Sequence, residues 1–254
     1  VVGINRLFYQ FPVGESFTFT AGAKVRQDDM LAMWPSVYPA DTILDLFTYA
    51  GARAAYNLNI GAGVGGWYQK DGFSASVNYV SAESRSENAE LGVFKGFTVT
   101  GQVGYAVENW GAAFAYTYSS GFATLDTESN NIGLSGYWQP SEAAWMPSIS
   151  AGFGYSDVAD GPGDLWSWMV GLQWADAFVK GNALGMAIGS AGQSANGDGT
   201  GGLWLDNGED TLAYELWYKF QVTDNISVTP AFFYIQNDGV SDTAGGLLKT
   251  TFKF

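Results

Sequence analysis

Apolar and polar side chains alternate along most of this chain, in segments of about ten residues separated by turn residues. In the last segment, residues 245–254, Phe252 and Phe254 fall on one face of an extended chain, while Lys249 and Lys253 fall on the other. Because a period of two is the period of a β-strand, each such segment is predicted to be a strand with two unlike faces. About thirteen such strands occur along the chain, so we expect an all-β fold.

The connections between these strands fall into two classes. Short ones at 13–16, 69–72, 108–111, 140–146, 175–181 and 223–225 alternate with mostly longer ones at 27–57, 82–95, 120–129, 156–164, 191–210 and 237–243. Short periplasmic turns and longer outside loops are typical of an outer-membrane barrel. A soluble sandwich would bury Val, Ile and Leu in a dry interior, whereas the apolar faces here are rich in aromatic residues. The sequence therefore predicts a transmembrane antiparallel β-barrel in the cell outer membrane.

The alternation also predicts which side chains face the lipid bilayer and which face the lumen. The lipid-facing set shares the apolar parity of its strands and includes Phe19, Val103, Phe114, Trp168, Phe232 and Phe252. The lumen-facing set shares the polar parity and includes Arg26, Lys219, Lys249 and Lys253. In the strand 17–26, this places Val25 on the lipid side and Lys24 and Arg26 on the lumen side.

Composition narrows the class of protein further. The mean hydropathy is −0.01 although 47% of the 254 residues are hydrophobic, and no apolar run approaches the ~20 residues of a membrane helix. The chain contains neither Cys nor His, which removes thiolate chemistry, the commonest general base and the usual zinc ligand. Its net charge of −14 disfavours nucleic acid as a partner. We therefore expect no enzyme, no cofactor and no metal site.

Residues 27–57 break the alternation and form a connection about twice as long as a compact domain normally tolerates without structure. They combine acidic with apolar and aromatic residues, namely Asp28, Asp29, Asp41, Asp45, Met33, Trp34, Tyr38 and Phe47. Such a connection either folds on itself outside the barrel or folds into the barrel and narrows it. On the inward face of the next strand, Gly61, Gly63 and Gly65 either make room for it or serve a bend of the wall.

A connection that enters the barrel would oppose its charges to those of the wall. The candidate residues of such a constriction are Asp28, Asp29, Trp34, Asp41 and Asp45 from the connection, and Arg6, Lys24, Arg26, Lys219 and Lys249 from the wall. Opposed charges across a narrow pore create a transverse field that orders polar solutes, and the net acidity predicts a mild preference for cations. The adjacent carboxylates of Asp28 and Asp29 are interpreted as loop acids, because no cage of metal ligands accompanies them.

The strand count predicts that residues 1–254 form an incomplete barrel domain. The first and last of the thirteen or so strands run in the same direction and cannot pair antiparallel. A bacterial barrel has an even number of antiparallel strands, so an odd number of strands is expected upstream of Val1. Three would bring the barrel to about sixteen strands, and one is the alternative.

Six stretches carry a resemblance to a known family: NRLFYQFPVG, VRQDDMLAMWPSVYPADTILDLFTYAGA, AYNLNIGAGVG, DGFSASVNYVSA, ENWGAAFAYTYSSG and LLKTTFKF. With them the chain resembles the cyanobacterial outer-membrane porins known as iron-uptake or S-layer-homology porins, which belong with the carbohydrate-selective porins. From residue 160 to residue 215 only the pattern matches. The resemblance implies a barrel of about sixteen strands, a homotrimer, and a preceding S-layer-homology domain that binds a peptidoglycan-linked polymer. The residues present do not carry that domain.

A pore works through the shape and charge of its lumen and needs no catalytic group. The sequence therefore predicts a porin for passive diffusion of inorganic ions and small polar solutes, narrowed by residues 27–57, with iron uptake or carbohydrate transport as what the resemblance implies. The alternative is a structural barrel of low permeability that tethers the outer membrane to the peptidoglycan. An outer-membrane enzyme would need a hydroxyl and base or paired carboxylates in the lumen, and no such constellation is visible.

Overall fold

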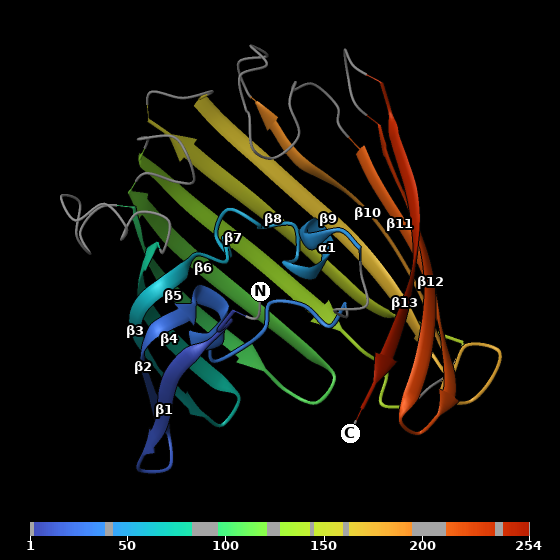
Figure 1. The fold of residues 1–254 in the computed structure, drawn as a ribbon, viewed down its shortest axis with the longest axis horizontal. Helices are drawn as coiled ribbons and strands as arrows, with labels where there is room; N and C mark the ends of the chain where they lie inside the picture. The colour runs from blue at the N-terminus through green and yellow to red at the C-terminus, as the bar shows by residue number, and fades with distance from the viewer. Residues whose placement is uncertain are drawn as a thin grey trace.

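A computed structural model describes residues 3–38, 43–82, 96–120, 128–142, 145–159, 163–194, 212–236 and 241–253. In this part of the chain, thirteen strands form a single antiparallel sheet in which every strand pairs with its neighbours in the sequence (Figure 1). The strands are β1 (Leu7–Val13), β2 (Phe17–Arg26), β3 (Ile60–Lys70), β4 (Phe73–Ala82), β5 (Phe97–Ala106), β6 (Trp110–Ser120), β7 (Glu128–Trp138), β8 (Ser148–Val158), β9 (Gly163–Ala175), β10 (Ala183–Ser194), β11 (Leu212–Thr223), β12 (Ile226–Gln236) and β13 (Thr243–Phe252). Each lies within or close to a predicted strand, so the predicted all-β sheet is confirmed.

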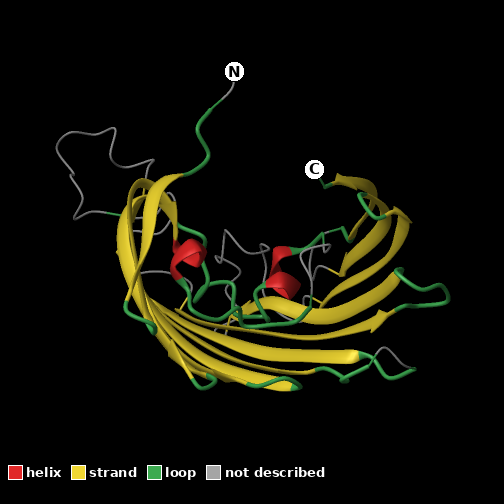
Figure 2. Cartoon of the chain, turned by 90° about the horizontal axis from the view of Figure 1, so that it is seen from below, coloured by secondary structure: helices red, strands yellow, loops and turns green. Residues whose placement is uncertain are grey.

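The sheet curls into a trough, and its two edge strands are β1 and β13 (Figure 2). Because every pairing along the sheet is antiparallel, β1 and β13 run in the same direction, and within the described residues they do not pair with each other. The trough is therefore open along one side, as expected from an odd strand count. That upstream strands complete the barrel stays a prediction.

Two short helices interrupt the connection between β2 and β3. They are the 3-10 helix η1 (Gln27–Met30) and the α-helix α1 (Asp45–Thr48), and both lie on the concave side of the sheet (Figure 2). Among the described residues, no helix is long and apolar enough to cross a membrane.

The two faces of the sheet differ as the alternation predicts. Of the six predicted lipid-facing residues, Phe19, Val103, Phe114, Phe232 and Phe252 are exposed on the convex face, and Trp168 is partly exposed with the same parity as its exposed neighbour Val170. On the concave face, Lys219 pairs with the buried Ala183 and Lys249 with the buried Thr229. Lys253 has the same parity as Lys249.

Strand β2 departs from the predicted alternation at a β-bulge between Gly22 and Val25, where one extra residue enters the strand relative to β3. Beyond a one-residue bulge, side chains that would have pointed to one face of the sheet point to the other face. Val25 is consequently buried on the inside, where it clusters with Met30 and Val80, so its predicted lipid exposure is wrong. The bulge also shifts Lys24 and Arg26 out of the predicted parity, but the Arg26 guanidinium still pairs with Asp28 of η1 on the concave side.

Candidate functional site

The connection between β2 and β3, residues 27–59, is called the inner segment here. Its described residues, 27–38 and 43–59, run along the concave face of the sheet (Figures 1 and 2). Helix η1 contacts β2, β3 and β4, and helix α1 contacts β9 and β10 on the far side of the trough. Of the two interpretations left open by the sequence, the structure therefore shows the one in which this connection folds inward.

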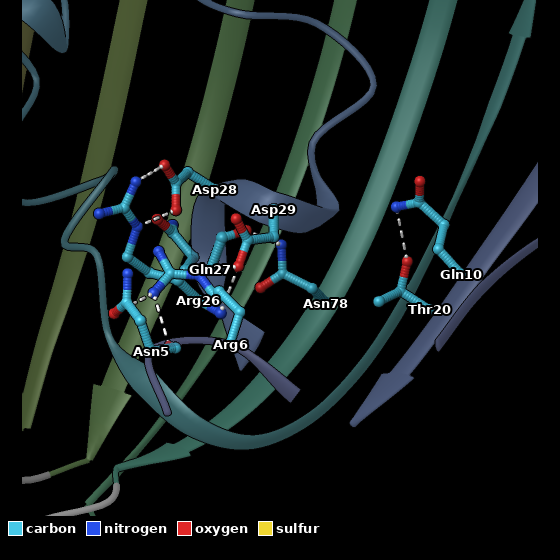
Figure 3. A network of polar contacts seen from close by, with 9 residues as sticks. All are labelled: Asn5, Arg6, Gln10, Thr20, Arg26, Gln27, Asp28, Asp29 and Asn78. Carbon is cyan, nitrogen blue, oxygen red and sulfur yellow. Dashed lines mark hydrogen bonds and ion pairs between the residues drawn. The ribbon is translucent and has the colours of Figure 1, made fainter. Parts of the chain in front are cut away.

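Buried Gln27 ties the start of the inner segment to its end and to the wall. Its side-chain amide donates hydrogen bonds to the Ala55 carbonyl and to the Thr100 hydroxyl, both at 2.7 Å. The Asn78 amide of β4 donates to the Gln27 carbonyl at 3.2 Å (Figure 3). The hydroxyl of Thr117 on β6 also donates to the Ala55 carbonyl, at 2.6 Å. Polar wall residues thus satisfy main-chain groups that would otherwise be buried without a partner.

The base of the inner segment carries two ion pairs between predicted site residues. The Arg6 guanidinium donates to the Asp29 carboxylate at 2.5 Å, and Arg26 forms a bidentate pair with Asp28 (Figure 3). The Arg26 main-chain N–H also donates to Asp29, at 2.8 Å. A carboxylate paired at such short range produces a much weaker field at a distance than a lone charge does. These two aspartates therefore contribute less to a transverse field than the sequence alone suggested.

Among the side chains that the structure describes, the other predicted site residues do not join these two pairs. Trp34 packs edge-on against Tyr49, with ring centroids 5.4 Å apart. Lys219 and Lys249 lie on β11 and β13, on the opposite side of the trough from η1 (Figure 1). Asp41 lies outside the described residues. Asp45 begins α1, and Lys24 pairs in register with Leu7 of β1.

Apolar side chains of the inner segment pack against the wall in two clusters. In the first, Tyr38, Leu46 and Phe47 contact the wall residues Met169, Ala183, Ala187, Ala213, Trp217, Ala231 and Ile235. In the second, Tyr49, Ala52, Ala55 and Tyr56 surround Ala115 of β6. Most of these wall positions are small, which lets the segment approach the strands closely. Burial of this apolar surface stabilises the folded-in position.

Glycines on the concave face make the closest approaches. A Cβ atom added to Gly152 would lie 2.0 Å from the Ala50 carbonyl oxygen, and one added to Gly171 would lie 2.7 Å from the Tyr38 ring. One added to Gly65 would lie 2.8 Å from the Met30 sulfur. The interpretation that the inward glycines of β3 make room for this connection is therefore confirmed at Gly65.

Wall hydroxyls complete the contacts in the middle of the segment. The Ser150 hydroxyl accepts hydrogen bonds from the main-chain N–H groups of Val37 and Tyr38, at 3.2 and 3.1 Å. The Ser167 hydroxyl donates to the Gly51 carbonyl at 2.5 Å. These contacts come from β8 and β9, so the inner segment is bonded across most of the sheet.

Glu215 of β11 also belongs to the site, although it is not among the site residues predicted from the sequence. It is 3% exposed, and its carboxylate accepts hydrogen bonds from the main-chain N–H groups of Ile43 and Leu44 at 2.6 and 2.7 Å. The hydroxyl of Tyr38 donates to the other carboxylate oxygen at 3.3 Å and accepts from the Trp217 indole N–H at 2.9 Å. The sequence signal was its inward parity beside Trp217.

Two tyrosines of the inner segment are held in their neutral form. Burial raises the pKa of Tyr56 to about 12, and its hydroxyl accepts a hydrogen bond from the Gln102 amide at 3.0 Å. Burial, and then the charge of Glu215, raise the pKa of Tyr38. Both phenols therefore pack as neutral groups over the ordinary pH range.

The described side chains include no group of three or more acidic residues that could hold a metal ion. The concave face of the sheet binds the inner segment through both hydrogen bonds and apolar contacts. The convex face of the same sheet is apolar. These features define an outer-membrane barrel of the porin class, with its longest described connection on the inner wall.

The comparison with known families agrees with this class. Residues 4–254 match the family described as Carbohydrate-selective porin, OprB family, so the chain belongs to that family. The family and the fold place the protein in the outer membrane, within a family of porins.

Two curated relatives are cyanobacterial. The uncharacterized protein alr4550 of Nostoc sp. is 28% identical over 300 residues, and the uncharacterized protein sll0772 of Synechocystis sp. is 22% identical over 300 residues. Both alignments cover 100% of this chain but only 50% and 54% of the relatives. The chain thus spans about half the length of the curated relatives it matches.

Solved porins share the fold at low sequence identity. Pseudomonas putida OprB superimposes with a TM-score of 0.66 at 12% identity, over 98% of this chain and 73% of that structure. Salmonella typhi OmpF, in a complex with daunomycin, gives 0.61 at 12% identity, over 96% and 88%. The trimer form of Vibrio cholerae OmpT gives 0.59 at 12% identity, over 93% and 77%.

Proposed function

We propose that this protein is a porin through which small polar solutes and inorganic ions diffuse passively, and that the inner segment narrows its lumen. The observation that carries the proposal is the course of the inner segment, which is bonded to inward-facing side chains from β4 to β11. A connection fixed on the inside of a barrel occupies part of its cross-section. Pore size and lining charge then decide what passes.

The solute class follows from family and charge. Membership of the carbohydrate-selective family supports small sugars as permeants, and the net charge of −14 supports a mild preference for cations. Passage of iron is the finer proposal that the family resemblance suggests. The lysines Lys219 and Lys249 lie across the trough from the base of the inner segment and are the basic side of the proposed field.

We further propose that additional strands complete the barrel, to about sixteen, because β1 and β13 run in parallel and both edges are unpaired within the described residues. Unpaired main-chain groups at a sheet edge are costly in hydrocarbon. A homotrimer is supported by the trimer form of the related Vibrio cholerae fold. An S-layer-homology domain that binds a peptidoglycan-linked polymer is proposed for the part of the relatives that this chain does not span.

Single-channel recording of the intact protein in planar bilayers tests the proposal. We expect discrete openings, a reversal potential shifted toward the cation in a salt gradient, and slower entry of larger sugars in a liposome-swelling assay. A correctly folded protein that gives no open events would contradict a diffusion pore. It would favour the alternative, a low-permeability barrel that tethers the outer membrane to the peptidoglycan.

A further inference from the structure

Glu215 has surroundings unlike those of any other acidic side chain that the structure describes. It is the one charged side chain in the described part of the chain that is buried. Among the same residues, no ion pair involves it. Its carboxylate instead accepts hydrogen bonds from two main-chain N–H donors and from one phenol.

All three of these donors belong to the inner segment. Tyr38 precedes the undescribed residues 39–42, whereas Ile43 and Leu44 follow them and lead directly into α1. One carboxylate therefore binds the chain on both sides of that stretch. Trp217, two positions further along β11, donates to the Tyr38 oxygen and orients the phenol toward Glu215.

We propose that Glu215 is a positioning residue for permeation: its carboxylate latches Tyr38, Ile43 and Leu44 to β11 and thereby fixes how far the middle of the inner segment extends into the lumen. This inference rests on the proposed channel function. The base of the segment is held by other contacts, at Gln27 and at the two arginine–aspartate pairs. Loss of the latch is therefore expected to release the middle while the base stays bound.

Glu215→Gln keeps the shape of the side chain and removes its charge, so it separates the latch from simple packing. The amide oxygen can still accept hydrogen bonds, but without charge assistance, and its NH₂ group adds donors where donors already converge. Glu215→Asp keeps the charge and shortens the reach by one methylene. We expect a smaller effect from Glu215→Asp than from Glu215→Gln.

Cysteine labelling measures release directly, because the protein has no native cysteine. Ala187→Cys on β10 places a thiol beneath the Leu46 and Phe47 cluster, at a position that is 7% exposed. Ala115→Cys places one beneath the Tyr49 and Tyr56 cluster, at 0% exposure. Each thiol is exposed to a water-soluble maleimide in the intact protein folded into liposomes.

With Glu215 unchanged, both thiols should react slowly. In the Glu215→Gln background, we expect the thiol at position 187 to react roughly tenfold faster, while the thiol at 115 stays protected. Glu142→Gln, the same chemical change in an exposed turn, should alter neither rate. Folding of each variant is checked by its heat-dependent shift in electrophoresis.

Three outcomes would overturn the latch. One is equal protection of position 187 with and without Glu215, and a second is fast labelling of 187 even with Glu215 present. The third is simultaneous exposure of 187 and 115, which would mean that Glu215 supports the whole segment rather than its middle. If Glu215→Gln does not fold, Glu215→Asp is labelled instead, and full protection of 187 in that variant also counts against the latch.

Single-channel recording connects the latch to permeation. The released segment should change the unit conductance of Glu215→Gln and increase its open-channel noise, with no change in Glu142→Gln. If the unmodified protein gives no openings but the labelling contrast holds, the channel proposal fails and the latch stands. If the protein conducts and the labelling contrast is absent, the latch fails and the channel stands.

Discussion

The inner segment is attached to the barrel wall in two different ways, at its base and at its middle. At the base, Asp28 and Asp29 meet Arg26 and Arg6 in partly exposed ion pairs. In the middle, Glu215 is buried and meets only hydrogen-bond donors. Exposed pairs contribute little because water and salt compete for both partners, whereas a buried carboxylate is strongly tied to its donors. Formal charge is therefore a poor guide to which contacts hold the segment.

The largest effect is expected from Gly152→Val, which acts on packing rather than charge. Its new Cβ would lie 2.0 Å from the Ala50 carbonyl oxygen, so the segment or β8 must move. We expect a loss of about 3 kcal/mol in the free energy of unfolding, measured by urea titration in liposomes. Gly101→Val is the matched control, because a Cβ there meets nothing within 4 Å. Equal stability of the two variants would show that the inner segment does not pack closely against β8 at Gly152.

Alkaline pH should next loosen the inner segment at its two buried tyrosines, Tyr56 and Tyr38. The pKa of Tyr56 is raised from 10.0 to about 12, so its contribution is complete below the unfolded value and is lost as pH rises through the folded one. The raised pKa of Tyr38 acts in the same direction. Between pH 10 and 12 we expect the attachment of the inner segment to the wall to weaken by about 2 kcal/mol, seen as faster thiol labelling beneath the segment. Tyr56→Phe should remove part of this dependence, and an unchanged profile would contradict the assignment.

Tyr38→Phe should have a moderate effect. The change keeps the ring in its apolar cluster but removes the hydroxyl between the Trp217 indole N–H and the Glu215 carboxylate. Leaving the indole donor without its partner should cost about 1 kcal/mol of segment attachment. Labelling at Ala187→Cys measures the loss, and Trp217→Phe made in addition should restore part of it. A cost that is not relieved in the double variant would point to ring packing instead.

The smallest effect is expected from Asp28→Asn at the base. The Arg26–Asp28 pair is partly exposed, so its removal should weaken the attachment of the inner segment by about 0.5 kcal/mol, and by less at high salt. Conductance measured in low and in high salt provides the readout. A cost greater than that of Tyr38→Phe would reverse the ranking of the two attachments.

The strands and the class of protein were accessible from the sequence because alternation is a local property. Each strand needs only its own side chains to reveal its two faces, and even the odd count that leaves β1 and β13 parallel follows from counting. The bulge in β2 was not accessible. One extra residue between Gly22 and Val25 leaves the local alternation intact, and only the register against β3 shows that the faces exchange.

The site was predicted in part. The composition of residues 27–57 fits both an outside loop and a folded-in one, since Tyr38 and Phe47 could pack against either. The ion pairs used predicted residues, but Glu215 was missed because an inward-facing acid in a barrel ordinarily faces water. Its donors at Ile43 and Leu44 lie 172 and 171 positions away in sequence, and main-chain N–H groups carry no sequence signal.

The small residues on the concave face separate two tasks that a constriction normally combines. Because Gly65, Gly152 and Gly171 admit the inner segment almost against the strand backbones, its wall-facing side alone determines where it lies. Side chains on its other side are then free to vary in size and charge without disturbing the attachment. A barrel built in this way can acquire a new solute preference through changes confined to one surface of one connection, with no adjustment of its strands.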